Sequence, residues 1–182
     1  MRKLIMWNVI TLDGYFEGDQ KWDLSFHEKI WGKEVEELSI EQLQSADYLA
    51  FGRVTYEGMA SYWINEKGII ADYMNNIPKL VFSTTLKSAT WNNSILISNN
   101  ATERVKQLKQ EGGKDIYVFG SADLSATFIN ANLFDEYRIG IAPVLLGSGK
   151  LLFGKTTPKS LLLHSANALE NGGVLLRYGV SE

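Results

Sequence analysis

Short apolar runs recur along the chain, and segments of helical composition separate them. Residues 3–10 (KLIMWNVI) form the first run, which is too short for an ordinary helix and predicts a buried strand. Strands that alternate with helices are typical of an α/β domain with a mostly parallel sheet. We predict further strands at 48–51, 80–82, 94–97 and 116–119, and helices at 54–62, 69–75 and 122–131.

Two segments have the spacing of a capping box, in which a short polar side chain precedes Glu or Gln by three residues at a helix start. The first, Ser39-Ile40-Glu41-Gln42, predicts that a short helix begins at Ser39, after a stretch of helical composition at 23–37. The second, Asn100-Ala101-Thr102-Glu103, predicts a helix that begins at Asn100 and stops at Gly112-Gly113.

The last third of the chain favours extended structure. Residues 137–142 and 161–168 are predicted strands, and Asn171-Gly172 indicates a hairpin that leads into a strand at 174–178. We therefore expect one domain over residues 1–182, with antiparallel strands at one edge of its sheet. We also expect the apolar residues 161–163 to pair across a homodimer.

Composition narrows the chemistry. Of the 182 residues, 45% are hydrophobic and 21% charged, which is typical of a folded domain rather than a disordered chain. The formal net charge of −3 gives no nucleic-acid-binding signature, and no apolar run has the ~18 residues of a membrane span. With 0 cysteines and only 2 histidines, disulfides, thiolate nucleophiles and Cys-based or three-His zinc sites are excluded. We expect a cytosolic protein without a metal site.

Three predicted strands end in residues that suit phosphate groups. In the first such segment, 51–57, Gly52 allows a ligand close to the backbone, Arg53 offers a planar donor fork, and Thr55 adds a hydroxyl. The others are Ser83-Thr84 after the strand at 80–82 and Gly120-Ser121-Ala122 after the strand at 116–119. The segment at 51–57 alone is equally well explained as an ordinary turn, Ser83-Thr84 alone is more often one, and the glycine turn at 120–122 lacks the full Gly-x-Gly-x-x-Gly fingerprint. Because ligands of open α/β sheets bind beyond the carboxyl ends of the strands, the three together favour a dinucleotide site.

Asp13 is the most suggestive acid, because it follows the first strand directly. Its alternative role is to shape the turn at Gly14, and the sequence favours neither role over the other. His27 lies on a predicted early helix near the Asp13 turn, where it could face a cleft, although a surface position is the simpler expectation. His164 lies in a predicted hairpin strand, where a packed or a solvent-facing histidine is expected.

Five segments occur in an order that resembles a known family: 11–15 (TLDGY), 51–57 (FGRVTYE), 118–121 (VFGS), 135–137 (DEY) and 142–150 (APVLLGSGK). This ordered set is similar to the dihydrofolate-reductase-like superfamily and covers nearly the whole chain. Within it, the chain most resembles the C-terminal reductase domain of the bifunctional riboflavin-biosynthesis deaminase–reductase and its free-standing relatives. The resemblance implies a three-layer α/β/α fold around a mixed sheet, and NADPH as the cofactor.

The resemblance also implies roles for particular residues. Asp13-Gly14 would begin the loop over the active site. The implied cofactor contacts are Val9 and Ile10 at the nicotinamide, Gly52, Arg53 and Thr55 at the 2′-phosphate or pyrophosphate, Ser83 and Thr84 on the adenosine side, and Gly120, Ser121 and Ala122 at the pyrophosphate.

The resulting hypothesis is an NADPH-dependent reductase of a small heterocyclic substrate, similar to the 5-amino-6-(5-phosphoribosylamino)uracil reductase domain of riboflavin biosynthesis. The cofactor would deliver hydride, and Asp13 or water would relay a proton. Tyr15, Phe16 and Trp22 are candidates to stack on a planar substrate, although such residues more often pack in a core.

Alternatives remain open. One is a catalytically inactive, nucleotide-binding homodimer, and another is a dihydrofolate reductase-type activity. Against the latter, Lys21-Trp22-Asp23 lacks the proline of the Pro-Trp pair in dihydrofolate reductases, and Glu28 matches their substrate-binding acid only loosely. A hydrolase is a more distant possibility, because the chain has no Gly-x-Ser-x-Gly nucleophile elbow.

Overall fold

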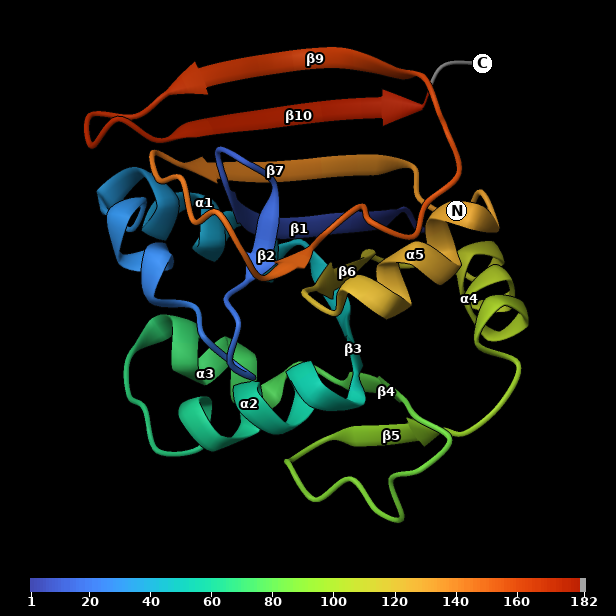
Figure 1. Cartoon of the computed structure of the whole chain (residues 1–182). Helices are drawn as coiled ribbons and strands as arrows, with labels where there is room; N and C mark the ends of the chain where they lie inside the picture. Colours follow the sequence, from blue (N-terminus) through green and yellow to red (C-terminus); the bar gives the residue numbers. More distant parts are fainter. Residues whose placement is uncertain (181–182) are drawn as a thin grey trace.

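One eight-stranded sheet runs through the computed structural model, which describes residues 1–180. Its strand order is β5-β4-β3-β6-β1-β7-β10-β9, so the C-terminal hairpin and β5 lie at opposite edges (Figure 1). The pairs from β5 to β7 are parallel, whereas β10 is antiparallel to both β7 and β9. The strands are β1 (Leu4–Thr11), β3 (Ala46–Gly52), β4 (Lys79–Phe82), β5 (Ser94–Ile97), β6 (Asp115–Phe119), β7 (Glu136–Ala142), β9 (Leu161–Ala168) and β10 (Val174–Val180).

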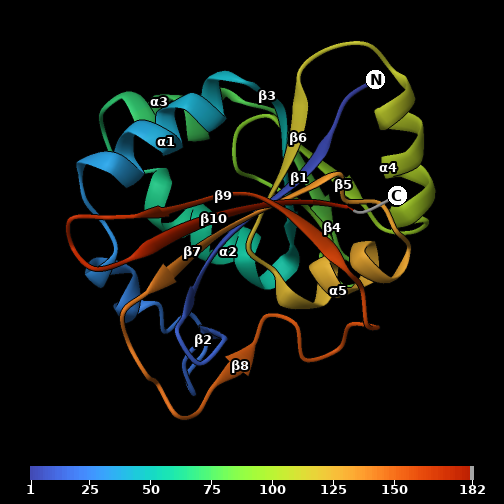
Figure 2. The same ribbon diagram turned by 90° about the horizontal axis from the view of Figure 1, so that it is seen from above.

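Helices cover both faces of this sheet, because apolar side chains of β1 point alternately to one face and to the other. Leu4 and Met6 point into one apolar cluster with residues of α4 (Ala101–Gln110) and α5 (Ala122–Asn130). Ile5 and Trp7 point into another cluster with residues of η1 (Ser25–Lys29), α1 (Lys33–Gln44) and α3 (Ile69–Asn76). Figure 2 shows α1 and α3 on one side and α4 and α5 on the other. The predicted three-layer α/β/α fold with a mostly parallel sheet and an antiparallel C-terminal hairpin is therefore confirmed. The helices are η1 (Ser25–Lys29), α1 (Lys33–Gln44), α2 (Arg53–Trp63), α3 (Ile69–Asn76), α4 (Ala101–Gln110) and α5 (Ala122–Asn130).

The predicted helix start at Ser39 is wrong. Ser39 lies inside α1, where its hydroxyl donates a hydrogen bond to the Val35 carbonyl oxygen at 2.7 Å. The hydroxyl thus bonds within the helix instead of capping it, a local alternative that spacing alone does not distinguish. Helix α4 does begin directly after Asn100, but the Asn100 side chain makes no capping hydrogen bond.

A second, two-stranded sheet was not predicted from the sequence. It pairs β2 (Tyr15–Glu17) with β8 (Lys150–Leu151) in antiparallel fashion. Strands of two or three residues are too short to show an alternating pattern, so only the fold reveals them. This sheet holds the segment after β1 beside the loop that precedes β8, and Figure 1 shows the chain after β2 (blue) reaching down to α2.

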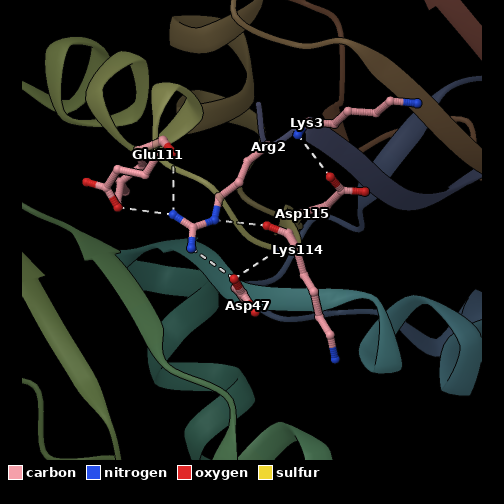
Figure 3. A network of polar contacts seen from close by, with 7 residues as sticks. Arg2, Lys3, Asp47, Glu111, Lys114 and Asp115 are labelled. Carbon is pink, nitrogen blue, oxygen red and sulfur yellow. Dashed lines mark hydrogen bonds and ion pairs between the residues drawn. The ribbon is translucent and has the colours of Figure 1, made fainter.

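The amino ends of the central strands are joined by a network around Arg2 (Figure 3). The Arg2 guanidinium is almost fully buried, and it contacts Asp47 at 2.9 Å, Glu111 at 3.1 Å and the Lys114 carbonyl oxygen at 3.0 Å. The Lys3 backbone N–H donates to Asp115 at 2.9 Å. These contacts stabilise the sheet at the amino ends of its strands and leave the carboxyl ends for a ligand.

No helix within residues 1–180 has the length and apolar character needed to cross a bilayer.

Candidate functional site

Two adjoining cavities lie beyond the carboxyl ends of the parallel strands. The polar cavity has a volume of about 540 Å³, and the aromatic cavity one of about 570 Å³. Phe16, Trp22, Leu24 and Thr55 line both, so the cavities meet along these side chains. The polar cavity is formed by residues 52–55, 82–85, 97–101 and 121–124 together with Phe16, Glu17, Trp22, Leu24, Thr127 and Lys150. The aromatic cavity is formed by residues 7–9, Phe16, Trp22, Leu24, His27, Glu28, Ile30, Trp31, Val35, Ser39, Leu43, Thr55, Met59, Tyr62, Trp63, Ile70, Met74, Phe119 and Gly120.

Three helices begin at the polar cavity. They are α2, α4 and α5, whose N-cap residues are Gly52, Asn100 and Ser121. None of the three N-termini has a side-chain capping hydrogen bond. The first N–H groups of a helix have no partner within it, and they carry the positive end of the helix dipole. The cavity is therefore arranged to accept more than one negatively charged group.

The turn before α5 has an unusual backbone. Gly120 and Ser121 both have positive φ angles, of 72° and 67°. A side chain at Gly120 would collide with Thr55, and one at Gly52 would collide with the Ser121 hydroxyl. Two backbone turns thus approach each other closely at the cavity floor, and Ser121 is held in a region that residues other than glycine rarely adopt. Such local strain is concentrated at ligand-binding sites.

Arg53 supplies a cation at the entrance of the polar cavity. Its Nη1 lies 3.1 Å from Glu57 Oε2, and Lys21 lies 3.5 Å from the same oxygen. The Arg53 and Glu57 side chains are 42% and 38% exposed, and ion pairs this exposed are weak. The guanidinium is consequently free to exchange Glu57 for a phosphate group, with which it can form two parallel hydrogen bonds.

Sequence reasoning missed several residues of the polar cavity. Lys150 lies 2.7 Å from Asp123, whose pKa is lowered by hydrogen bonds from Lys150 and Lys155. Residues 98–100 line the cavity directly after β5. Their signal was present in the sequence, because three polar residues follow a predicted strand there. Lys150 had no such signal, since β8 and α5 bring it to the cavity only in the fold.

The aromatic cavity differs sharply in character. Its lining within residues 1–180 contains no Lys or Arg, and Glu28 is its one acidic residue. His27 also lines it, and burial lowers the pKa of His27 to about 4, so the imidazole is neutral at physiological pH. The Nε2 atom of His27 is buried and has no hydrogen-bond partner among the described residues. His27 thus faces a cavity, the alternative considered beside the favoured surface position, and His164 is the solvent-facing rather than the packed histidine.

Trp22 separates the two cavities. Its backbone has a φ of 66°, and its N–H donates a hydrogen bond to Glu17. The indole lies over Gly58 of α2, where any Cβ would overlap the ring. This contact explains a glycine in the middle of a helix, which otherwise costs about 1 kcal/mol relative to alanine.

Most of the predicted cofactor residues meet at these cavities. Gly52, Arg53, Thr55, Ser83, Thr84, Ser121 and Ala122 line the polar cavity, and Val9 and Gly120 line the aromatic one. The Ile10 side chain instead joins the apolar cluster with α4 and α5, outside both linings. The Ser83 hydroxyl oxygen already accepts a hydrogen bond from the Leu86 N–H at 2.9 Å, so Ser83 also stabilises its own turn.

Of the predicted substrate residues, Phe16 and Trp22 line both cavities, and Tyr15 lines neither. The Tyr15 hydroxyl donates to the Gly147 carbonyl oxygen at 3.3 Å. Tyr15 therefore contacts the loop before β8 and leaves stacking to the other two aromatics.

Asp13, the predicted catalytic acid, lies outside both linings. Its carboxylate accepts hydrogen bonds from the backbone N–H groups of Leu146 at 3.0 Å and Gly147 at 2.8 Å, and from the Thr11 hydroxyl at 2.5 Å. The Thr11 hydrogen bond, followed by the backbone ones, lowers the pKa of Asp13. This geometry corresponds to the second role considered for Asp13, shaping the chain at the turn.

Comparison with known proteins identifies the family. A family model described as the RibD C-terminal domain matches residues 2–175. The chain belongs to this family. The uncharacterized protein YyaP of Bacillus subtilis is 33% identical over 158 residues, which cover 84% of this chain and 80% of that protein. This relative supports membership of the RibD C-terminal domain family but names no activity.

Solved structures share the fold of this RibD C-terminal domain. A putative riboflavin biosynthesis protein from Shewanella sp. PV-4 has a TM-score of 0.80 at 20% identity, with 99% of each chain covered. A dihydrofolate reductase from Enterococcus faecalis, solved as a complex with NADP(H) and RAB-propyl, has a TM-score of 0.65 at 12% identity, with 99% of this chain and 97% of that chain covered. The predicted relationship to the riboflavin-type reductase domain and to dihydrofolate-reductase-like folds is thereby confirmed.

Proposed function

We propose that this chain is an NADPH-dependent reductase of a small, planar heterocyclic compound. The observation that carries the proposal is the meeting of three uncapped helix N-termini and Arg53 in one polar cavity. That arrangement suits a ligand with several phosphate groups. Family membership supports a reductase, and the similar fold of a dihydrofolate reductase that binds NADP(H) supports this cofactor.

The donor groups of the polar cavity fit NADPH in number and type. The turns at Gly52 and at Gly120-Ser121 would hold the pyrophosphate through backbone N–H groups, and Arg53 would contact the 2′-phosphate or the pyrophosphate. Ser83 and Thr84 would lie on the adenosine side. The nicotinamide, when bound, supplies the hydride, so the chain needs no nucleophile or metal of its own.

The protein's contribution is to orient the reactants and exclude water. Phe16, Trp22 and Thr55 line both cavities, so a ring in the aromatic cavity and a ligand in the polar cavity would meet along these side chains. Holding two reactants in one geometry is itself a large part of catalysis. Because the Asp13 carboxylate is occupied by Leu146 and Gly147, we assign it to positioning of that loop and assign proton delivery to water.

The decisive test of the cofactor site is a calorimetric titration of the full chain with NADPH and with NADH. We expect Arg53→Ala to weaken NADPH binding by about tenfold or more, because a charge-assisted hydrogen bond is worth roughly 1.5–3 kcal/mol, and to change NADH binding less. Arg104→Ala, which removes the same charge outside the cavity, should leave both affinities unchanged. Failure of the wild type to bind NADPH, or equal affinity for the two cofactors, would contradict the proposal.

A further inference from the structure

We infer that the substrate of this site is a planar ring compound that carries no phosphate or other anionic group. The inference rests on the proposed function, because it names the substrate class of the same site. It also separates this chain from a reductase of a phosphoribosylaminouracil, the activity that the sequence resemblance suggested. The charged groups that line the aromatic cavity differ from those that line the polar cavity.

The aromatic cavity offers nothing that neutralises an anion. Within residues 1–180, no Lys or Arg lines it, and the N-terminal residues of α4 and α5 line the polar cavity instead. Proteins hold phosphate with guanidinium groups, ammonium groups or helix N-termini. Transfer of a phosphate from water into an apolar cavity without such partners carries a large free-energy penalty.

The ionisable residues of the aromatic cavity act against an anion as well. Glu28 lines its exposed side and would repel a negatively charged ligand. His27 cannot compensate, because burial lowers its pKa to about 4 and leaves the imidazole uncharged near pH 7. The cavity therefore selects neutral or cationic rings.

The polar cavity shows the opposite arrangement. Arg53 and Lys150 line it together with three uncapped helix N-termini. Among the described residues, the lining cations and the three N-cap residues Gly52, Asn100 and Ser121 thus belong to the polar cavity alone. This distribution of charge assigns the anionic groups to the cofactor in the polar cavity. It leaves the aromatic cavity for a ring without anionic groups.

The other side chains of the aromatic cavity indicate the shape and polarity of the ring that it binds. Trp7, Trp31 and Phe119 present aromatic surface, which favours stacking on a flat ligand. Among the described residues, the His27 Nε2 atom and both polar atoms of the Asn8 side chain have no hydrogen-bond partner. These atoms and the Thr55 hydroxyl can pair with heteroatoms of that ring. A volume of about 570 Å³ accommodates a ring system of two or three fused rings.

The test compares 2-naphthol with 2-naphthyl phosphate, which share one flat bicyclic ring and differ in a single phosphate. Calorimetric titrations are run in phosphate buffer, so that inorganic phosphate occupies anion sites of the polar cavity. We expect the phosphate ester to bind the wild type about tenfold more weakly than the neutral ring, or weaker still. Glu28→Lys, which replaces the acid with a cation, should reduce this ratio about fivefold or more by improving binding of the ester.

Glu36→Lys is the matched control, because Glu36 is exposed on α1, lines neither cavity and changes the net charge equally. The control should bind both probes as the wild type does. Equal affinities for the two probes, tighter binding of the ester, or no binding of either probe to the wild type would overturn the inference. NADPH titration of the same proteins in a phosphate-free buffer separates the two proposals. Intact NADPH binding with a failed probe comparison rejects only the substrate class, whereas absent NADPH binding rejects the proposed function.

Discussion

His27 shows how burial changes the chemistry of a single side chain. Its ring lies 4.9 Å from that of Phe26 in an edge-to-face arrangement, and its Nε2 has no partner among the described residues. Burial lowers the pKa from 6.5 to about 4. The sequence left His27 between a surface and a cleft position, because a lone histidine carries no signal of its environment. The environment of His27 becomes evident only from the packing of η1 against the aromatic cavity.

The His27 imidazole, whose Nε2 atom is buried, predicts an acid-dependent loss of stability. In the pH range between about 4 and 6.5 the unfolded chain binds a proton at His27 and the folded chain does not, so the free energy of unfolding falls as the pH falls through that range. Lowering the pH from about 7.5 to about 5 should cost about 2 kcal/mol through this residue. Urea unfolding of His27→Gln at both pH values should show a correspondingly smaller pH dependence than the wild type.

The other histidine provides the control for that experiment. His164 is exposed on β9, so His164→Gln should retain the full pH dependence. An identical pH dependence in His27→Gln and the wild type would show that His27 is protonated equally in the folded and unfolded chains.

At the scale of elements, strands were predicted more reliably than helix ends. The strand at 94–97 was predicted with the bounds it has in the structure, Ser94–Ile97, because a short apolar run between polar residues is typical of a strand, even at the partly exposed edge where β5 lies. The predicted helix start at Ser39 was wrong, because the same spacing also fits a serine that bonds to a carbonyl inside a helix. The three cofactor-side turns were predictable, since they follow strands, whereas the aromatic cavity assembles residues from segments far apart in the sequence.

The loop before β8 depends on Asp13. We expect Asp13→Ala to speed hydrogen exchange at the Leu146 and Gly147 amides and to lower the melting temperature, because both N–H groups lose their acceptor. Since the pKa of Asp13 is lowered in the fold, its stabilisation is present above the ordinary Asp pKa and is lost as the pH falls through the folded value. Exchange at these two amides can be followed residue by residue by NMR.

Asp19→Ala serves as the comparison, because Asp19 contacts the same loop only through the Ser148 hydroxyl, at 2.6 Å. It should leave exchange at Leu146 and Gly147 unchanged. Unaltered exchange in Asp13→Ala would refute the positioning role, and a loss of turnover without any change in exchange would restore Asp13 as a candidate catalytic acid.

At the scale of the whole molecule, the sheet ends in an uncovered strand. β9 is the outermost strand beside β10, and Leu162, Leu163 and Val180 on this hairpin are 57%, 51% and 41% exposed. Edge strands with exposed apolar residues favour pairing with another chain. We propose a homodimer formed through this edge, with the cavities on the carboxyl side of the sheet in each subunit.

Sedimentation at micromolar concentration should therefore show a dimer. Leu162→Glu should convert it to a monomer, because it places a charge within the shared apolar edge. Ile95→Glu introduces the same charge on β5, at the opposite edge of the sheet, and should leave the dimer intact. A monomeric wild type, or dissociation by Ile95→Glu alone, would reject this interface.

We propose that a reduced dinucleotide binds in the polar cavity with its nicotinamide at the boundary with the aromatic cavity. The aromatic cavity is lined by Trp7, Trp22, Trp31 and Trp63. Energy transfer from these tryptophans to bound NADPH therefore reports whether the nicotinamide lies beside them. Titration with NADPH should quench tryptophan emission and give sensitised nicotinamide emission, both saturating together, and NADH should saturate at a higher concentration. Absence of a saturable signal would contradict binding of NADPH in the polar cavity. Saturation at the same concentration by NADPH and NADH would contradict recognition of the 2′-phosphate there.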